Sequence, residues 1–188
     1  VLLHGYGADS RLSLPKLSTM TSVRVDVAPA DTLEAPKLAS HTLGELAVAG
    51  ASSTLTLPLL ANADGTSLGA FDGATLSLPA LTSLSTNLAS CSPCYQLAVR
   101  GPGSVLSLPN LASLSALDNG PYVPFLGIGA QDGGHLDLSG LTTIAPPAFV
   151  SVLVDAYGAG TIVDLTSLAV FDPAKVNFYE GGGAEILR

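Results

Sequence analysis

The chain has few of the large or charged residues on which many protein cores and binding surfaces depend. Trp is absent, Met occurs once, and aromatic residues make up 5% of the 188 residues. A core built around large rings is therefore excluded. The hydrophobic residues, 47% of the chain, are mostly Leu, Val and Ala. This composition favours small aliphatic side chains stacked in regular layers.

Charge is scarce as well, and it is mostly negative. Charged residues make up 12% of the chain, against about 25% in an average soluble domain. Seven Lys and Arg against fifteen Asp and Glu give a net charge of −8. Phosphate binding needs clustered cations, so nucleic acid is excluded as a partner. No apolar run approaches the roughly 20 residues of a membrane-spanning helix, so no membrane insertion is expected.

What the chain does have is a repeated phrase, Leu-x-Leu-Pro-x-Leu. Five copies carry the proline, at Pro15, Pro36, Pro58, Pro79 and Pro109. Two altered copies carry Ser139 and Thr166 in its place. The successive steps are 21, 22, 21, 30, 30 and 27 residues. A period in this range is typical of a solenoid.

Within each repeat, apolar residues alternate with small polar ones over three short segments separated by Gly, Pro and Ser turns. This alternation is the period of a β-strand with one buried face. The pattern predicts an all-β fold, a single parallel β-helix of about seven to eight coils over residues 1–188. We expect right-handed coils by analogy with parallel crossovers. A leucine-rich-repeat solenoid is the alternative, although no copy has a helical half and the expected Asn is missing except, out of register, at Asn110.

Stacking the coils in register predicts an inward and an outward column of side chains on the Leu-x-Leu strand. The inward column would contain Leu12, Leu33, Leu55, Leu76, Leu106, Leu136 and Val163. The outward column would contain Ser13, Glu34, Thr56, Ser77, Ser107, Asp137 and Asp164. Asp137 and Asp164 are then neighbours, as the catalytic carboxylates of a glycosidase or the ligands of Ca²⁺ would be. A solvated acidic pair without chemistry is the alternative reading.

The longer steps place extra residues at 86–96, 116–125 and 145–151, all in the same part of the coil. Such insertions either build a binding face or shield a sheet edge. Five aromatic residues lie in or beside them, namely Tyr95, Tyr122, Phe125, Phe149 and Tyr157. These rings are candidates for stacking on sugars or anchoring a protein partner. Covering the hydrophobic edge beneath the insertions is the alternative.

The remaining candidate groups are two cysteines and three histidines. Cys91-Ser-Pro-Cys94 is expected to form a small disulfide in an oxidising compartment. Free thiols, a redox dithiol or half a zinc site remain alternatives. His4, His41 and His135 share no metal-ligand spacing and are expected to be isolated surface residues without a metal.

The phrase Gly-x-Gly-Ser-x-Leu-x-Leu-Pro/Ser-x-Leu-x-x-Leu, clearest at 101–114, resembles repeats of secreted or surface-exposed bacterial β-helix proteins, including pectin-lyase-like and adhesin solenoids. The resemblance implies a bacterial cell-surface or extracellular location. We expect a structural or adhesive segment rather than an enzyme. It would be part of a longer repeat protein or a stacking subunit, assembling end to end through its coil ends. A carbohydrate-binding or glycan-active β-helix using the insertion face, with a glycan or surface protein as partner, is the second hypothesis.

Overall fold

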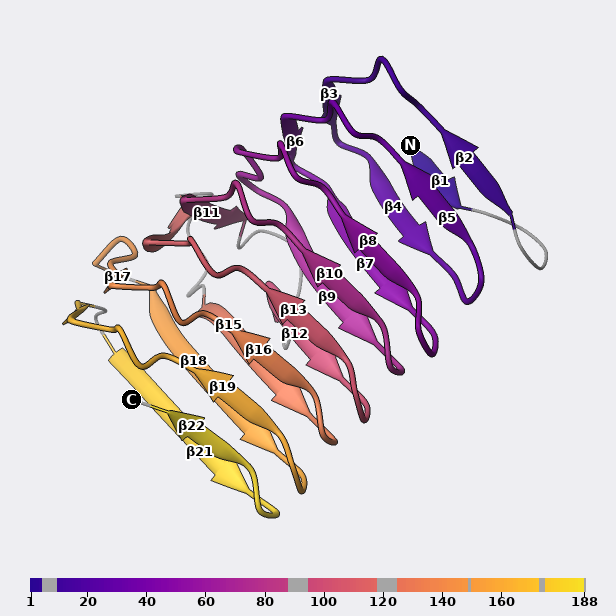
Figure 1. The fold of residues 1–188 in the computed structure, drawn as a ribbon. Coiled ribbons are helices and arrows are strands. Elements are labelled where there is room, and N and C mark those ends of the chain that lie inside the picture. Colours follow the sequence, from indigo (N-terminus) through magenta and orange to yellow (C-terminus); the bar gives the residue numbers. More distant parts are fainter. Residues whose placement is uncertain (5–9, 88–94, 118–124, 149, 173–174, 188) are drawn as a thin grey trace.

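In the computed structural model the chain is a parallel β-helix, which confirms the predicted all-β class. Residues 1–4, 10–87, 95–117, 125–148, 150–172 and 175–187 are described. The coils stack along one axis, with the two termini at opposite ends of the stack (Figure 1). The leucine-rich-repeat alternative is wrong, because no helix accompanies any strand in the described segments. The handedness stays a prediction.

The strands of successive turns line three faces. The first face is an eight-stranded parallel sheet in the order β1-β4-β7-β9-β12-β15-β18-β21. Its strands are β1 (Leu2–His4), β4 (Arg24–Val27), β7 (Glu45–Ala49), β9 (Ser67–Phe71), β12 (Leu97–Arg100), β15 (Phe125–Gln131), β18 (Ser151–Tyr157) and β21 (Lys175–Gly181).

The second face carries the Leu-x-Leu strands. It comprises β2 (Arg11–Ser13), β5 (Thr32–Glu34), β8 (Thr54–Thr56), β10 (Thr75–Ser77), β13 (Val105–Ser107), β16 (His135–Asp137), β19 (Ile162–Asp164) and β22 (Glu185–Leu187). The third face comprises β3 (Thr19–Thr21), β6 (Ser40–Thr42), β11 (Ser83–Asn87), β14 (Ser113–Leu117), β17 (Thr143–Ile144) and β20 (Val170–Phe171). On the second face β2 and β5 form a separate two-stranded sheet.

The solenoid has about six turns, fewer than the seven to eight expected. Six turns of the described chain carry a named strand on all three faces. The turn that contains β7 and β8 has only an isolated bridge at Asn62 on the third face, and the turn of β21 and β22 has two described strands. Counting copies of the phrase therefore overestimates the complete turns.

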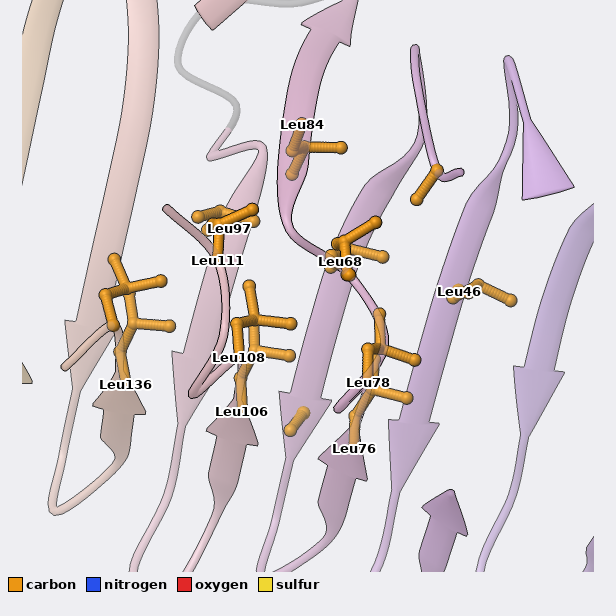
Figure 2. Close-up of a cluster of buried hydrophobic side chains, with 14 of the residues drawn as sticks. Leu46, Leu68, Leu76, Leu78, Leu84, Leu97, Leu106, Leu108, Leu111 and Leu136 are labelled. Atoms are coloured by element: carbon orange, nitrogen blue, oxygen red, sulfur yellow. The ribbon is translucent and has the colours of Figure 1, made fainter. Parts of the chain in front are cut away.

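The inward column on the second face forms largely as predicted. Leu55, Leu76, Leu106, Leu136 and Val163 pair in register from strand to strand, and Ile186 continues the column. Leu12 pairs with Leu33, but β5 and β8 belong to different sheets, so the strand pairing is interrupted there. The leucines of neighbouring coils stack inside the solenoid (Figure 2). Leu76, Leu106 and Leu136 are fully buried, and burial of each such side chain contributes roughly 1.5–3 kcal/mol.

The proline of the phrase lies in a tight turn that leads from the second face to the third. In the copy at Leu57-Pro58-Leu59-Leu60, the Leu60 N–H donates to the Leu57 carbonyl at 3.2 Å. Proline suits the second position of this turn because its φ is preset and its missing N–H leaves no donor to satisfy. The same turn hydrogen bond recurs in the coil without proline, from Leu141 to Leu138 at 2.8 Å.

Candidate functional site

The predicted acidic pair is present on the second face. Asp137 of β16 pairs directly with Asp164 of β19, on adjacent coils. Each carboxylate accepts hydrogen bonds from the residue two positions ahead. Ser139 donates to Asp137 Oδ1 from its N–H at 3.1 Å and its hydroxyl at 2.7 Å. Thr166 donates to Asp164 Oδ1 in the same way, at 3.0 and 2.8 Å.

These hydrogen bonds explain why proline is replaced in just these two coils. Ser139 and Thr166 have the backbone N–H that proline lacks, and the nearby Asp accepts it. The Asp side chain thus accepts a turn N–H that does not exist in the coils with proline, as Asp often does in turns. Both carboxylates are therefore engaged by the turns of their own coils.

The electrostatics of Asp137 point the same way. Burial acts to raise the pKa of Asp137, but hydrogen bonds from Ser139 and Ser107 and the nearby His135 together hold it below its ordinary value. A glycosidase acid needs a raised pKa. Asp137 is therefore ionised at neutral pH and suited to accept hydrogen bonds. In the described segments, no group of three or more His, Cys, Asp or Glu side chains lies close enough to hold a metal ion.

A different site is found on the outer surface of the first face, where β9, β12 and β15 lie side by side. Gly69, Ala98 and Gly129 occupy one register position of these strands. Ala98 and Gly129, which have little or no side chain, line a hollow of about 430 Å³ on the sheet. Its other lining residues are Ala49, Phe71, Asp72, Tyr95, Val99, Arg100 and Gln131.

Two aromatic rings lie against the glycines at this register position. A Cβ at position 69 would lie 2.6 Å from Phe71 Cζ, and a Cβ at position 129 would lie 2.6 Å from Tyr95 Cδ1. Both distances are far below a van der Waals contact, so each ring occupies the space that any larger residue would fill. The glycines in these strands therefore leave the space that the rings occupy.

A hydrogen bond to Asp155 of β18 holds Tyr95 in this position. The phenol donates to Asp155 Oδ2 at 2.7 Å, and Gln131 Nε2 approaches the same oxygen at 3.5 Å. Burial and then the neighbouring carboxylate raise the pKa of Tyr95 to about 12. The phenol is neutral over the physiological pH range, and its ring orientation is fixed.

The rim of the hollow is polar. Asp72 and Arg100 are exposed, and Gln131 is half-buried. Arg100 forms no ion pair with another residue of the described segments. The site therefore combines flat apolar rings with polar side chains at its rim, the usual design of a small-molecule site.

Of the three predicted aromatic residues that the structure describes, only Tyr95 lines this hollow. Phe125 is half-buried at the start of β15, and Tyr157 is 59% exposed at the end of β18 beside Gln131. Tyr122 and Phe149 lie outside the described residues, as do Cys91 and Cys94 of the predicted disulfide. Phe71, which the sequence reasoning missed, carries no insertion signal; the glycine two positions before it was the available hint.

The expectation of surface histidines is wrong for His41. Its side chain is fully buried in the inward column of the third face, where it pairs in register with Met20. His41 Nδ1 lies 3.1 Å from Thr66 Oγ1, and that hydroxyl donates to the His41 carbonyl at 2.8 Å. Burial lowers the pKa of His41 more than the carbonyls of Val23 and His41 raise it. This histidine is a neutral part of the core.

No protein-family model, curated protein or solved structure matches this chain. The β-helix fold therefore stands on the described strands alone. The described segments also contain no helix long and apolar enough to span a membrane.

Proposed function

We propose that this chain is a structural or adhesive solenoid segment of an extracellular or surface-exposed bacterial protein, of the adhesin type, and not an enzyme. The observation that supports it best is the continuous parallel ladder of the first face, in which eight strands pair in register. Almost all buried side chains serve this stack, and the one acidic pair satisfies its own turns. Such a ladder makes a stiff rod that holds its outer faces at fixed spacing.

Assembly through coil ends is part of this proposal. In the described structure β1 and β21 are the outermost strands of the first face, and each pairs on one side only. On the outermost turn at the β1 end, Leu2 is 51% exposed and Leu12 is 39% exposed. Open strand edges with apolar neighbours favour pairing with further coils, from the same protein or from a second copy.

Light scattering over a range of protein concentrations tests the assembly. We expect the mean mass to rise with concentration and Leu12→Lys to reduce that rise, because lysine opposes stacking at a coil end. Ser77→Lys, on the outward side of the middle of the stack, is the matched control and should assemble like the wild type. A monomeric wild type at every concentration, or equal losses in both variants, would refute end-to-end assembly.

A second candidate function is carbohydrate binding without catalysis. The hollow between Phe71 and Tyr95 favours it, because flat rings beside hydrogen-bonding groups suit the apolar faces and hydroxyls of a sugar.

A further inference from the structure

The two rings of the hollow belong to a longer row on the first face. Gly69, Ala98, Gly129, Asp155 and Tyr179 occupy one register position on successive strands, from β9 to β21. The Phe71 ring lies over the first of these positions and the Tyr95 ring over the third. Tyr179 itself stands at the fifth and is 58% exposed. We name Phe71, Tyr95 and Tyr179 the aromatic row.

The spacing of the aromatic row is regular because the strands are. Neighbouring members are two strands apart, and two strand spacings equal about 9.6 Å. The strands that carry the row stack along the solenoid axis (Figure 1), so the row crosses them one after another. A linear ligand lying on it would meet a ring every 9.6 Å or so.

We propose that the aromatic row binds an extended, neutral β-1,4-linked glycan, with one pyranose ring seated in the hollow over Ala98. In such a chain each sugar is rotated by about half a turn from the last, so equivalent faces recur every second unit, at roughly the two-strand spacing of the row. This inference names a ligand for the adhesive part of the proposed function and rests on that function only for its biological setting.

The chemistry of the rim favours a neutral glycan over an acidic one. Arg100 and Asp72 place one cation and one anion beside the hollow, and they cancel. Asp155, next along the row, adds a negative charge, in a chain whose net charge is −8. A uronate chain lying on the row would meet this negative charge where it crosses β18. Hydroxyl groups instead find an acceptor in Asp72 and donors in Arg100 and Gln131.

The size of the site agrees with one sugar and its neighbours. The hollow of about 430 Å³ lies within the range of small-ligand pockets, roughly 300–1,000 Å³. Its floor is the half-buried Ala98, which presents only a methyl group. A longer side chain there would fill the hollow without touching the buried core.

Isothermal titration calorimetry with defined hexasaccharides tests the proposal. The probes are cellohexaose, β-1,4-mannohexaose and β-1,4-xylohexaose, with maltohexaose, hexagalacturonate and a proline-rich decapeptide for comparison. We expect at least one neutral β-1,4 probe to bind more tightly than all three comparison ligands. Binding to none of the β-1,4 probes, or a preference for any comparison ligand, overturns the inference.

Three variants locate the binding. Ala98→Leu fills the hollow. Gly129→Ala displaces the Tyr95 ring without removing any aromatic residue from the sequence. Each should weaken binding by about tenfold or more, the loss of one good aromatic contact. Ser77→Leu, a half-buried outward position on the second face, should bind like the wild type. Unchanged affinity in Ala98→Leu, whose folding is checked by its thermal midpoint, overturns the assignment.

The sugar titration and the light-scattering test fail independently. Intact assembly without sugar binding overturns only the aromatic row. Sugar binding by a strictly monomeric chain refutes end-to-end assembly and leaves the row standing.

Discussion

Exchanging two residues should convert an unusual coil into a common one. Asp137→Ser together with Ser139→Pro turns the copy at 136–139 into Leu-Ser-Leu-Pro, the sequence found at 76–79 and 106–109. Either change alone should destabilise the fold, because each removes the two hydrogen bonds between residues 137 and 139 and leaves the other partner in place. Both together should be close to neutral.

The magnitudes follow from the hydrogen bonds that are lost. Asp137→Ser removes the acceptor of three hydrogen bonds, from Ser107 Oγ, Ser139 N and Ser139 Oγ. The hydroxyls can turn to water but the half-buried N–H does so less well, so the cost is about 1–2 kcal/mol, as for a lost helix cap. Ser139→Pro alone costs about 1 kcal/mol, partly offset by the smaller entropy of the unfolded chain. The double variant has neither an unpaired N–H nor an acceptor without donors.

Urea unfolding of the four proteins measures this coupling as a double-mutant cycle. We expect a favourable interaction energy of about 1 kcal/mol or more, well above the roughly 0.3–0.5 kcal/mol scatter of independent sites. The equivalent cycle at Asp164 and Thr166, one coil further, should also show a favourable interaction energy, because Thr166 donates the same two hydrogen bonds to Asp164. Additive losses at both coils would show that Asp and Ser do not act as a unit, and the explanation of the missing proline would fail.

Two further predictions concern buried polar side chains. The pKa of His41 in the fold lies below its unfolded value of 6.5. Its contribution to stability should therefore be complete above pH 6.5 and be lost as the pH falls through the lower folded value. Urea midpoints from about pH 7.5 downward measure this loss, and an equal dependence of the midpoint on pH in His41→Leu would contradict it. Ser104 Oγ donates to the Arg100 carbonyl at 2.7 Å and accepts from Gly73 N at 2.8 Å, so Ser104→Ala should cost about 1–3 kcal/mol. Ser53→Ala is the control, because Ser53 Oγ is buried without a partner in the described segments, and equal losses in the two would refute the role of Ser104.

The stack of coils could be predicted because the copies of the repeat share the same spacing of buried aliphatic residues. Leu76, Leu106 and Leu136 each sit two residues before another leucine and three before the turn residue, so one register satisfies all of them. A slip by one residue would expose the whole set. The pairing of Asp137 with Asp164 follows from the same register and was predicted correctly.

The hollow was not predictable in the same way. Its members come from different parts of the repeat, because Phe71 ends a strand whereas Tyr95 follows an insertion. What joins them is the absence of side chains at Gly69 and Gly129, which a pattern of hydrophobic residues does not register. His41 was misjudged for a related reason, since a single polar residue in an aliphatic column looks like a surface residue until its column is known.

Tyr95 shows how a uniform rod acquires a local site without a change in its core. The residue precedes β12, yet its ring lies over Gly129 of β15 and its hydroxyl reaches Asp155 of β18. It therefore ties three successive coils together on their outer surface, while Leu97 and Ile128 beneath it keep the regular inward register. Gly129 of the next coil leaves the room that the ring occupies. An insertion paired with a strand glycine one coil later is then a sequence signal for an aromatic surface site on this kind of solenoid.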